Sequence, residues 1–198
     1  MDGSLVLRWS LTVAFALAGG YCTAQCVGVL RTRGRLDTST LLANVAHLAM
    51  SAVMVGMVWW TASWRVVTWE IALFAVAAGW FAVRVVAMAQ PVAGVRVRPP
   101  LAHGPAHSKL GCAYHATAMA AMVWMLTAMA GQSRMAGMSH GGSSPATRAL
   151  TATLLAAYFA IAAAVWLSSA GRRRRMPGSS AQALMSAAMG TAIVTLAW

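Results

Sequence analysis

Two stretches of the chain place a histidine at the head of a line of methionines. They are HLAMSAVMVGMVWW, residues 47–60, and HATAMAAMVWMLTAM, residues 115–129. A helix advances by about 100° per residue, so the methionines that follow each histidine fall within one sector around the axis. These residues are Met50, Met54 and Met57 after His47, and Met119, Met122, Met125 and Met129 after His115. Each stretch predicts a helical face that carries one imidazole and several thioethers.

These side chains are ligands for soft metal ions. Thioether sulfur is soft and uncharged, which suits Cu(I), and imidazole binds copper, zinc, iron or nickel. The flexible segment GQSRMAGMSHGGSSPAT, residues 131–147, adds Met135, Met138 and His140. We interpret this segment as a collecting site for copper and the two histidine-headed faces as a buried site.

Packing is the competing interpretation of the methionines, because a methionine stripe at helical spacing is more often core than a metal site. Their clustering favours a metal, since most of the 14 methionines lie in three predicted helices or in residues 131–147. The third of these helices carries Met185 and Met189. Haem b is a further alternative, because histidines on two neighbouring helices can ligate one iron from opposite sides.

The composition predicts an integral membrane protein. The 198 residues are 60% hydrophobic and 9% charged, whereas soluble domains carry about 25% charged residues. A membrane-spanning helix needs about 20 mostly apolar residues, and backbone groups in lipid must pair within the span. We therefore expect an all-α, polytopic bundle of six spans in a single domain, residues 1–198, with spans at about 5–30, 40–61, 66–88, 110–130, 149–170 and 180–198. The first span lacks the basic start of a signal peptide, so we expect it to stay as a helix.

The basic residues predict the orientation of this bundle. They account for the net charge of +12 and gather in alternate loops, which is typical of topology signals rather than of nucleic-acid binding. One set of loops holds ten of them: Arg31, Arg33, Arg35, Arg96, Arg98, Lys109 and the run Arg172, Arg173, Arg174, Arg175. The other set holds four, Arg8, Arg65, Arg134 and Arg148. The positive-inside rule then places both termini outside, and most tryptophans lie at the ends assigned to the outer interface.

Three similar phrases suggest an internal repeat of helical hairpins. They are FALAGGY from residue 15, FAVAAGWF from 74 and FAIAAAVW from 159. A basic loop and a helix with a Met-x-x-x-Met motif follow each phrase. Internal repeats are common in transporters; chance likeness among alanine-rich spans is the alternative.

Other polar residues offer little for catalysis. Asp2, Asp37 and Glu70 are the only acids and lie at span ends, so we expect no general acid–base chemistry and no enzyme. Three cysteines, Cys22, Cys26 and Cys112, do not predict a disulfide framework. Arg84 lies inside the third span, where we expect its side chain to extend to the interface; binding an anionic lipid or substrate is the alternative.

The Met-x-x-x-Met motifs at residues 50–54, 125–129 and 185–189, with a deeper polar ligand and an outer Met-rich segment, resemble the Ctr-type copper importers. That family has three spans per chain and a glycine zipper, and this sequence matches neither. The overall layout, with histidine and methionine in spans two and four, is similar to an uncharacterised actinobacterial membrane family, a domain of unknown function. This resemblance implies a multi-pass protein of the bacterial plasma membrane.

We therefore expect a protein that binds or conducts a soft metal ion, Cu(I) first, through a Met- and His-lined bundle. A structural or assembly subunit of a membrane complex is the alternative, and a bis-histidine haem b protein is the second one. The expected partners are the lipid bilayer and either a membrane complex or a metallochaperone, but no nucleic acid.

The charge pattern makes a topology test possible. A reporter fused after Trp198 should be active in the outer compartment, and one fused after Arg175 should be active in the cytoplasm. Both fusions can be compared with reporters of known topology. Finding the Trp198 fusion in the cytoplasm would remove one span from the prediction.

Overall fold

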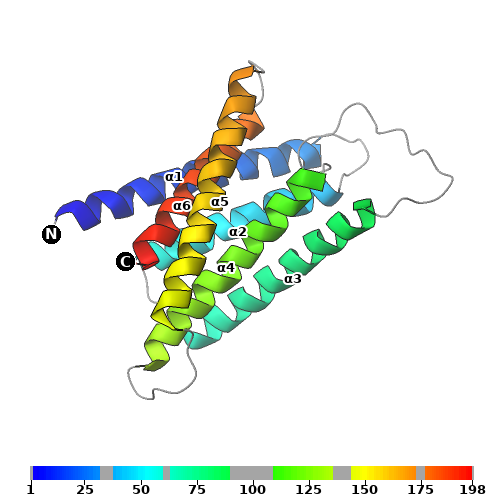
Figure 1. Ribbon diagram of the computed structural model, residues 1–198. Helices are drawn as coiled ribbons and strands as arrows, with labels where there is room; N and C mark the ends of the chain where they lie inside the picture. The colour runs from blue at the N-terminus through cyan, green and yellow to red at the C-terminus, as the bar shows by residue number, and fades with distance from the viewer. Residues whose placement is uncertain are drawn as a thin grey trace. The chain divides into compact units, whose positions relative to one another are not determined.

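Six helices account for nearly all the residues described. The computed structural model describes residues 2–31, 38–59, 63–89, 109–135, 144–172 and 177–197. These residues form helices and no strand (Figure 1), which confirms the predicted all-α class. The helices are α1 (Asp2–Arg31), α2 (Thr38–Trp59), α3 (Trp64–Ala89), α4 (Lys109–Met135), α5 (Pro145–Arg172) and α6 (Pro177–Ala197). Each begins and ends within about five residues of a predicted span.

Local sequence signals explain where two helices begin. Ser144 caps α5, because its Oγ accepts a hydrogen bond of 3.2 Å from the backbone N–H of Thr147. Pro145 takes the first helical position, which needs no N–H donor, and Pro177 does the same in α6. The prolines therefore mark the first residues of α5 and α6.

Hydroxyl groups within the helices bond to carbonyl groups of the preceding turn. Thr12 donates to the carbonyl of Arg8 at 2.8 Å, Thr117 to that of Ala113 at 3.0 Å, and Ser186 to that of Gln182 at 2.8 Å. An unpaired hydroxyl in hydrocarbon is costly, and this local bond removes the penalty. Thr12, Thr117 and Ser186 are thus compatible with a lipid environment, whereas the buried hydroxyl of Ser51 has no partner among the described residues.

Five of the helices are long and apolar enough to cross a membrane. Their apolar segments are Leu5–Gly28, Leu41–Trp59, Arg65–Ala89, Lys109–Ala130 and Pro145–Ser169. The 21-residue helix α6 is not among them. The apolar helices support a lipid bilayer as the surroundings of the protein.

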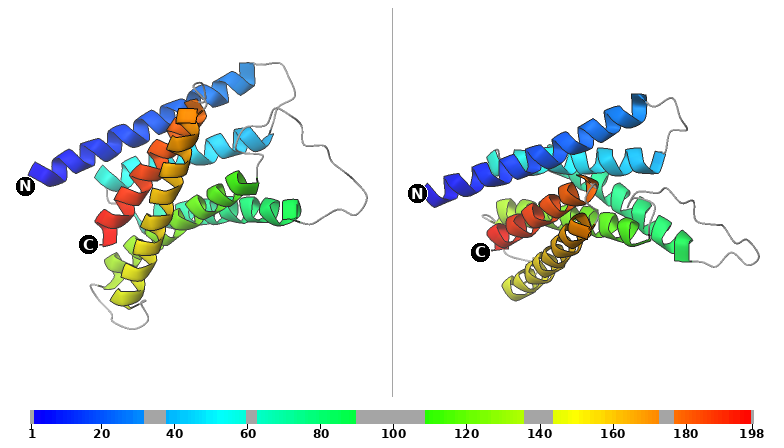
Figure 2. Two further views of the ribbon diagram at one scale, coloured as in Figure 1. Left: turned by 45° about the horizontal axis from the view of Figure 1, so that its top comes forward. Right: turned by 90° about the horizontal axis from the view of Figure 1, so that it is seen from above.

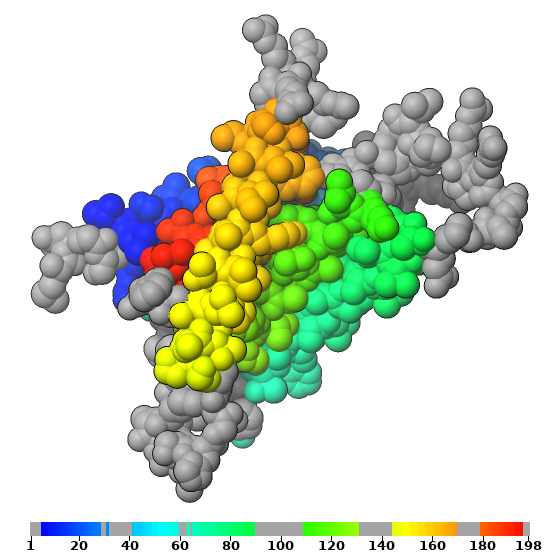
Figure 3. All heavy atoms as spheres, in the orientation of Figure 1, coloured from blue at the N-terminus to red at the C-terminus, as the bar shows by residue number. Residues whose placement is uncertain are grey.

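Burial distinguishes the helices further. Half of the apolar window of α4 is buried, but only 11% of the corresponding windows of α3 and α5. Large apolar side chains stand exposed on α3, such as Val76 and Val83, and on α5, such as Leu154 and Ile161. Figure 3 shows α5, in yellow, on the surface that faces the viewer. Such apolar surfaces are stable against lipid tails.

The helices form two compact units. The first unit contains Met1–Cys22, Ser51–Ala62 and Gly131–Trp198, and the second contains Thr23–Met50 and Ser63–Ala130. The first unit therefore holds α5, α6, the first part of α1 and the end of α2. The second holds α3, most of α4, the start of α2 and the end of α1.

Phenylalanine and methionine form the core of each unit. The largest fully buried side chains of the first unit are Phe15, Met54, Phe159, Met185 and Met189, and those of the second are Met50, Phe74, Phe81, Met119, Met122, Met125 and Leu126. The phenylalanine that begins each of the three similar phrases is at most 1% exposed. The first residue of each phrase is thus buried in the core of its unit, and the repeat itself stays a prediction.

A tryptophan pair joins α1 and α2 within the first unit. The ring centroids of Trp9 and Trp59 lie 5.0 Å apart in an edge-to-face arrangement. The indole N–H of Trp59 also donates a hydrogen bond of 2.8 Å to Oγ1 of Thr12. The two helix ends that the tryptophan pattern assigns to one interface therefore lie together.

Helices α5 and α6 pack side by side in all views (Figures 1 and 2), and a glycine sets their separation. A Cβ at Gly190 of α6 would lie 3.6 Å from the Cβ of Phe159 and 3.7 Å from the carbonyl oxygen of Ala156. These are ordinary contact distances, so one methyl group fits there. A longer side chain does not fit without moving α5.

Gly190→Leu should therefore destabilise the protein by about 1–3 kcal/mol through overpacking. Gly190→Ala should stay near the wild type, because alanine fits and favours a helix. Thermal unfolding in detergent measures both. Gly79→Leu is the matched control, because a Cβ at Gly79 meets nothing within 4 Å; equal losses for both leucine variants would contradict the packing described.

Candidate metal site

Two buried histidines lie in contact in the second unit. The ring centroids of His47 on α2 and His115 on α4 are 4.7 Å apart, and the planes meet at 82°. The two residues are 5% and 2% exposed, so neither ring has access to solvent. The two histidines that head the methionine faces are therefore in direct contact.

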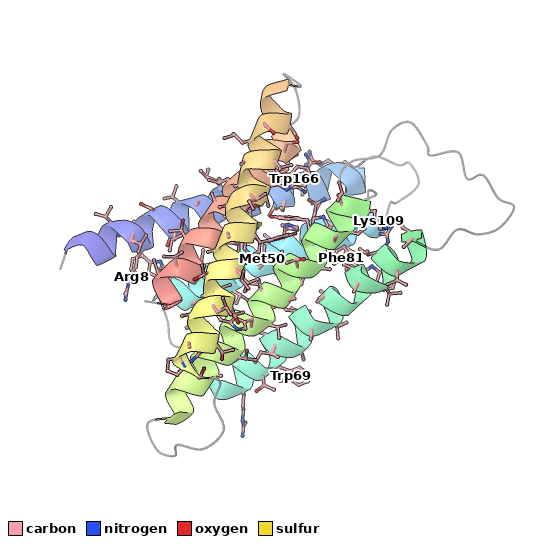
Figure 4. All side chains as sticks on the ribbon, viewed as in Figure 1. Arg8, Met50, Trp69, Phe81, Lys109 and Trp166 are labelled. Atoms are coloured by element: carbon pink, nitrogen blue, oxygen red, sulfur yellow. The ribbon has the colours of Figure 1, made fainter. Side chains whose placement is uncertain are left out.

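Aromatic rings from two helices surround the pair. Phe81 of α3 lies 5.1 Å from His115, and Tyr114 of α4 lies 5.6 Å from His115 and 6.4 Å from His47, centroid to centroid. Figure 4 labels Phe81 on α3. Phe81 and Tyr114 are 1% and 4% exposed. The histidines therefore occupy an apolar and largely aromatic environment in which helices α2, α3 and α4 meet.

Hydrogen bonding leaves three of the four ring nitrogens without a partner. His47 Nδ1 lies 2.8 Å from the carbonyl oxygen of Ala43, one turn earlier in α2. The carbonyl can only accept, so Nδ1 carries the proton, and Nε2 presents a lone pair when the ring is neutral. His47 Nε2 and both nitrogens of His115 are buried and have no hydrogen-bond partner among the described residues.

Methionines lie one turn beyond the histidines on both helices. Figures 1 and 2 show α4 and the part of α2 in this unit running in the same direction. Met50 follows His47 by three residues and Met119 follows His115 by four, which is about 5 Å along each helix axis. Both side chains are fully buried, as is Met122 one turn further. Because the histidines are in contact, the turn of α2 that carries Met50 and the turn of α4 that carries Met119 lie at about the same level.

The other predicted ligands are distributed differently. Met125 is buried and Met129 half-buried in the second unit, whereas Met54, Met57, Met185 and Met189 belong to the first unit. The side chain of Met135 and the whole of Met138 and His140 lie outside the described residues. No group of three or more His, Cys, Asp or Glu side chains that could hold a metal ion occurs in the described part of the chain. None of the three cysteines, Cys22, Cys26 and Cys112, forms a disulfide.

The distance between the ring centroids of His47 and His115 can be compared with the distances expected for the two metal cofactors considered, a small tetrahedral ion and haem. With metal–nitrogen bonds of about 2.0 Å, two imidazole centroids lie about 5 Å apart at a tetrahedral ion and about 6 Å apart across a haem iron. The observed 4.7 Å is close to the first value. A porphyrin between the rings would have to push α2 and α4 apart.

Sequence reasoning missed three groups that shape the site: the Ala43 carbonyl, Phe81 and Tyr114. The position of Ala43, four residues before His47, could have suggested its bond, because histidine can reach the carbonyl one turn back. Tyr114 is adjacent to His115 in the sequence, but nothing in that adjacency predicts that its ring turns toward His47. No local signal identifies Phe81, which comes from another helix.

A protein-family model described as Domain of unknown function (DUF5134) matches residues 39–196. The match covers both histidines and nearly all of α2 to α6. No curated protein and no solved structure gave a match to the chain. The family match supports the expected likeness to an uncharacterised domain family, and it adds no support for the likeness to the copper importers or for an actinobacterial source.

The unpartnered nitrogens make a stability prediction for the metal-free protein. Replacing His115 by leucine removes two buried polar atoms that gain no bond in the fold, so the variant should be as stable as the wild type or more stable by about 1–2 kcal/mol. His47→Leu should gain less, because it also loses the bond to Ala43. Chemical unfolding in the presence of a chelator measures both. A loss above about 2 kcal/mol for His115→Leu would mean that its nitrogens have partners, such as bound water.

Proposed function

We propose that this chain, which belongs to the family described as Domain of unknown function (DUF5134), binds one soft metal ion between His47 and His115. The observation that carries the proposal is the contact of two buried imidazoles with three ring nitrogens that lack a partner. Each such nitrogen costs about 1–3 kcal/mol when it stays unsatisfied. A metal ion that accepts lone pairs from both rings removes part of this penalty.

The ligand chemistry favours Cu(I) over divalent ions. Imidazole and thioether ligands are uncharged, and the described residues near the pair include no carboxylate. Glu70, the acid on α3, is eleven residues before Phe81, or about 16 Å along the helix. A doubly charged ion would therefore remain uncompensated in apolar surroundings, which costs more than burying one charge. Met50 and Met119 offer the soft sulfur ligands that Cu(I) prefers.

A wider proposal is that the protein also conducts the ion across the membrane. In a six-span bundle of the bacterial plasma membrane with both termini outside, the methionines after each histidine lie toward the outer surface. An ion collected by Met135, Met138 and His140 would then meet Met129, Met125 and Met122 before the histidine pair. A soluble metallochaperone or a membrane complex would receive the ion on the inner side.

One observation favours the second candidate, a structural or assembly subunit. Seven of the methionines are at most 2% exposed and fill the cores of both units, as pure packing residues would. In that case no metal binds, and the methionines serve only as packing residues. The two candidates differ in a measurable quantity, which is the metal content of the purified protein.

Protein purified from copper-supplemented cells should contain about one Cu(I) per chain, and the His47→Leu, His115→Leu double variant should contain almost none. Elemental analysis gives the stoichiometry, and the visible spectrum detects haem if it is present. Copper-free wild-type protein that cannot be reloaded with Cu(I) would exclude the proposal. A haem spectrum would assign the histidines to iron instead.

The thioethers can be tested separately from the imidazoles. Met50→Leu with Met119→Leu conserves volume and should cost less than about 1.5 kcal/mol per site. We expect Cu(I) affinity to fall by about tenfold or more while thermal unfolding stays similar. Met185→Leu is the matched buried control, because Met185 is also fully buried but belongs to the first unit. Unchanged affinity in the double variant would leave Met50 and Met119 as packing residues.

A further inference from the structure

Arg84, which has one terminal nitrogen without a hydrogen-bond partner among the described residues, lies on the same side of α3 as the histidine site. Arg84 follows Phe81 by three residues, so the two side chains lie on adjacent turns of one face. Phe81 contacts His115, so this face is turned toward α4. One terminal nitrogen of Arg84 is fully buried and has no hydrogen-bond partner among the described residues. The guanidinium is thus held against protein rather than extended freely into its surroundings.

The depth of Arg84 is suited to a headgroup rather than to the middle of a bilayer. The apolar segment of α3 ends at Ala89, five residues beyond Arg84, which is about 7.5 Å along the axis. An arginine side chain at that depth reaches the phosphate level of a bilayer. A phosphate group can therefore approach the guanidinium without crossing the apolar core.

A second cation lies nearby on α4. Figures 1 and 2 show that α3 ends where α4 begins, so the two helices are antiparallel. The contact between Phe81 and His115 then places Arg84 level with the turn of Cys112, and the exposed Lys109 one turn closer to the helix end. Figure 4 labels Lys109 at the start of α4. Two positive side chains thus occupy neighbouring turns.

The described part of the chain contains no acid to balance this charge. Glu70 is fourteen residues before Arg84, or about 21 Å away along the same helix. Asp2 and Asp37 are the only other acids of the protein, and Asp37 lies outside the described residues. An intramembrane charge without an internal partner is a strong indication of an external ligand.

We propose that Arg84 binds the phosphate group of an anionic ligand, which is either a phospholipid headgroup or free phosphate, at the Ala89 end of α3. The planar guanidinium donates two parallel hydrogen bonds to phosphate oxygens, and Lys109 adds a second positive charge. Arg84 and Lys109 are not among the ligands of the metal proposed between the histidines, so this site does not depend on that metal.

Native mass spectrometry of the full chain in a non-ionic detergent tests the proposal. The protein is titrated with phosphatidylglycerol and, separately, with phosphatidylcholine of the same acyl chains. Arg84→Gln should retain phosphatidylglycerol about tenfold less than the wild type, and Arg84→Lys should be intermediate, because lysine keeps the charge without the paired donors. Arg65→Gln, which removes one charge from the other end of α3, should bind like the wild type.

Competition with inorganic phosphate distinguishes the two sources. Displacement of the lipid by inorganic phosphate, with a matching rise in thermal stability that Arg84→Gln lacks, assigns the site to free phosphate. Lipid retention that resists inorganic phosphate assigns it to the headgroup. Equal binding of lipid and of phosphate by the wild type and Arg84→Gln would overturn the proposal. So would an equal loss of stability in Arg84→Gln, in Asp37→Asn and in the double variant, because Asp37 would then be the partner of Arg84.

Discussion

The contact between two imidazole rings in apolar surroundings determines the arrangement of the second unit. His47 is fixed by the carbonyl of its own helix, and His115 presses its ring against that of His47 and against Phe81. Two polar rings whose nitrogens are buried without partners cost free energy, so the apolar packing of α2, α3 and α4 around them must offset this cost. Phe81 and Tyr114 contribute to that packing.

The sequence alone predicts much of this fold because lipid simplifies the problem. Backbone groups in hydrocarbon must pair locally, so an apolar run of sufficient length predicts a helix, and polar segments with proline, such as Ser144 and Pro145, mark where it starts. The register of the two histidine-headed faces was also predictable, since each histidine follows the start of its helix by a similar length, nine residues in α2 and six in α4. This explains why the contact of His47 with His115 could be foreseen.

The remaining features could not be predicted, because periodicity describes one helix and not its neighbours. Met50 and Met54 are one turn apart on the same face, yet the first belongs to the second unit and the second to the first unit. A helix of 22 residues passes through two packing environments, and no local pattern marks the change. Phe81 was missed for a related reason: the rotation of α3 about its axis depends on contacts along its whole length, and alanine-rich faces differ little in apolar character.

Complete burial of the methionine sulfurs also governs their redox chemistry. Peroxide converts a thioether to a sulfoxide, which is polar and larger, and the reaction needs access to the sulfur. Met50, Met119 and Met122 have no exposed surface, whereas Met88 near the end of α3 is 39% exposed. Oxidant in solution therefore reaches Met88 first, and a sulfoxide at Met119 records that α2 and α4 have separated. Oxidation of a buried thioether would thus report that the surrounding helices had separated.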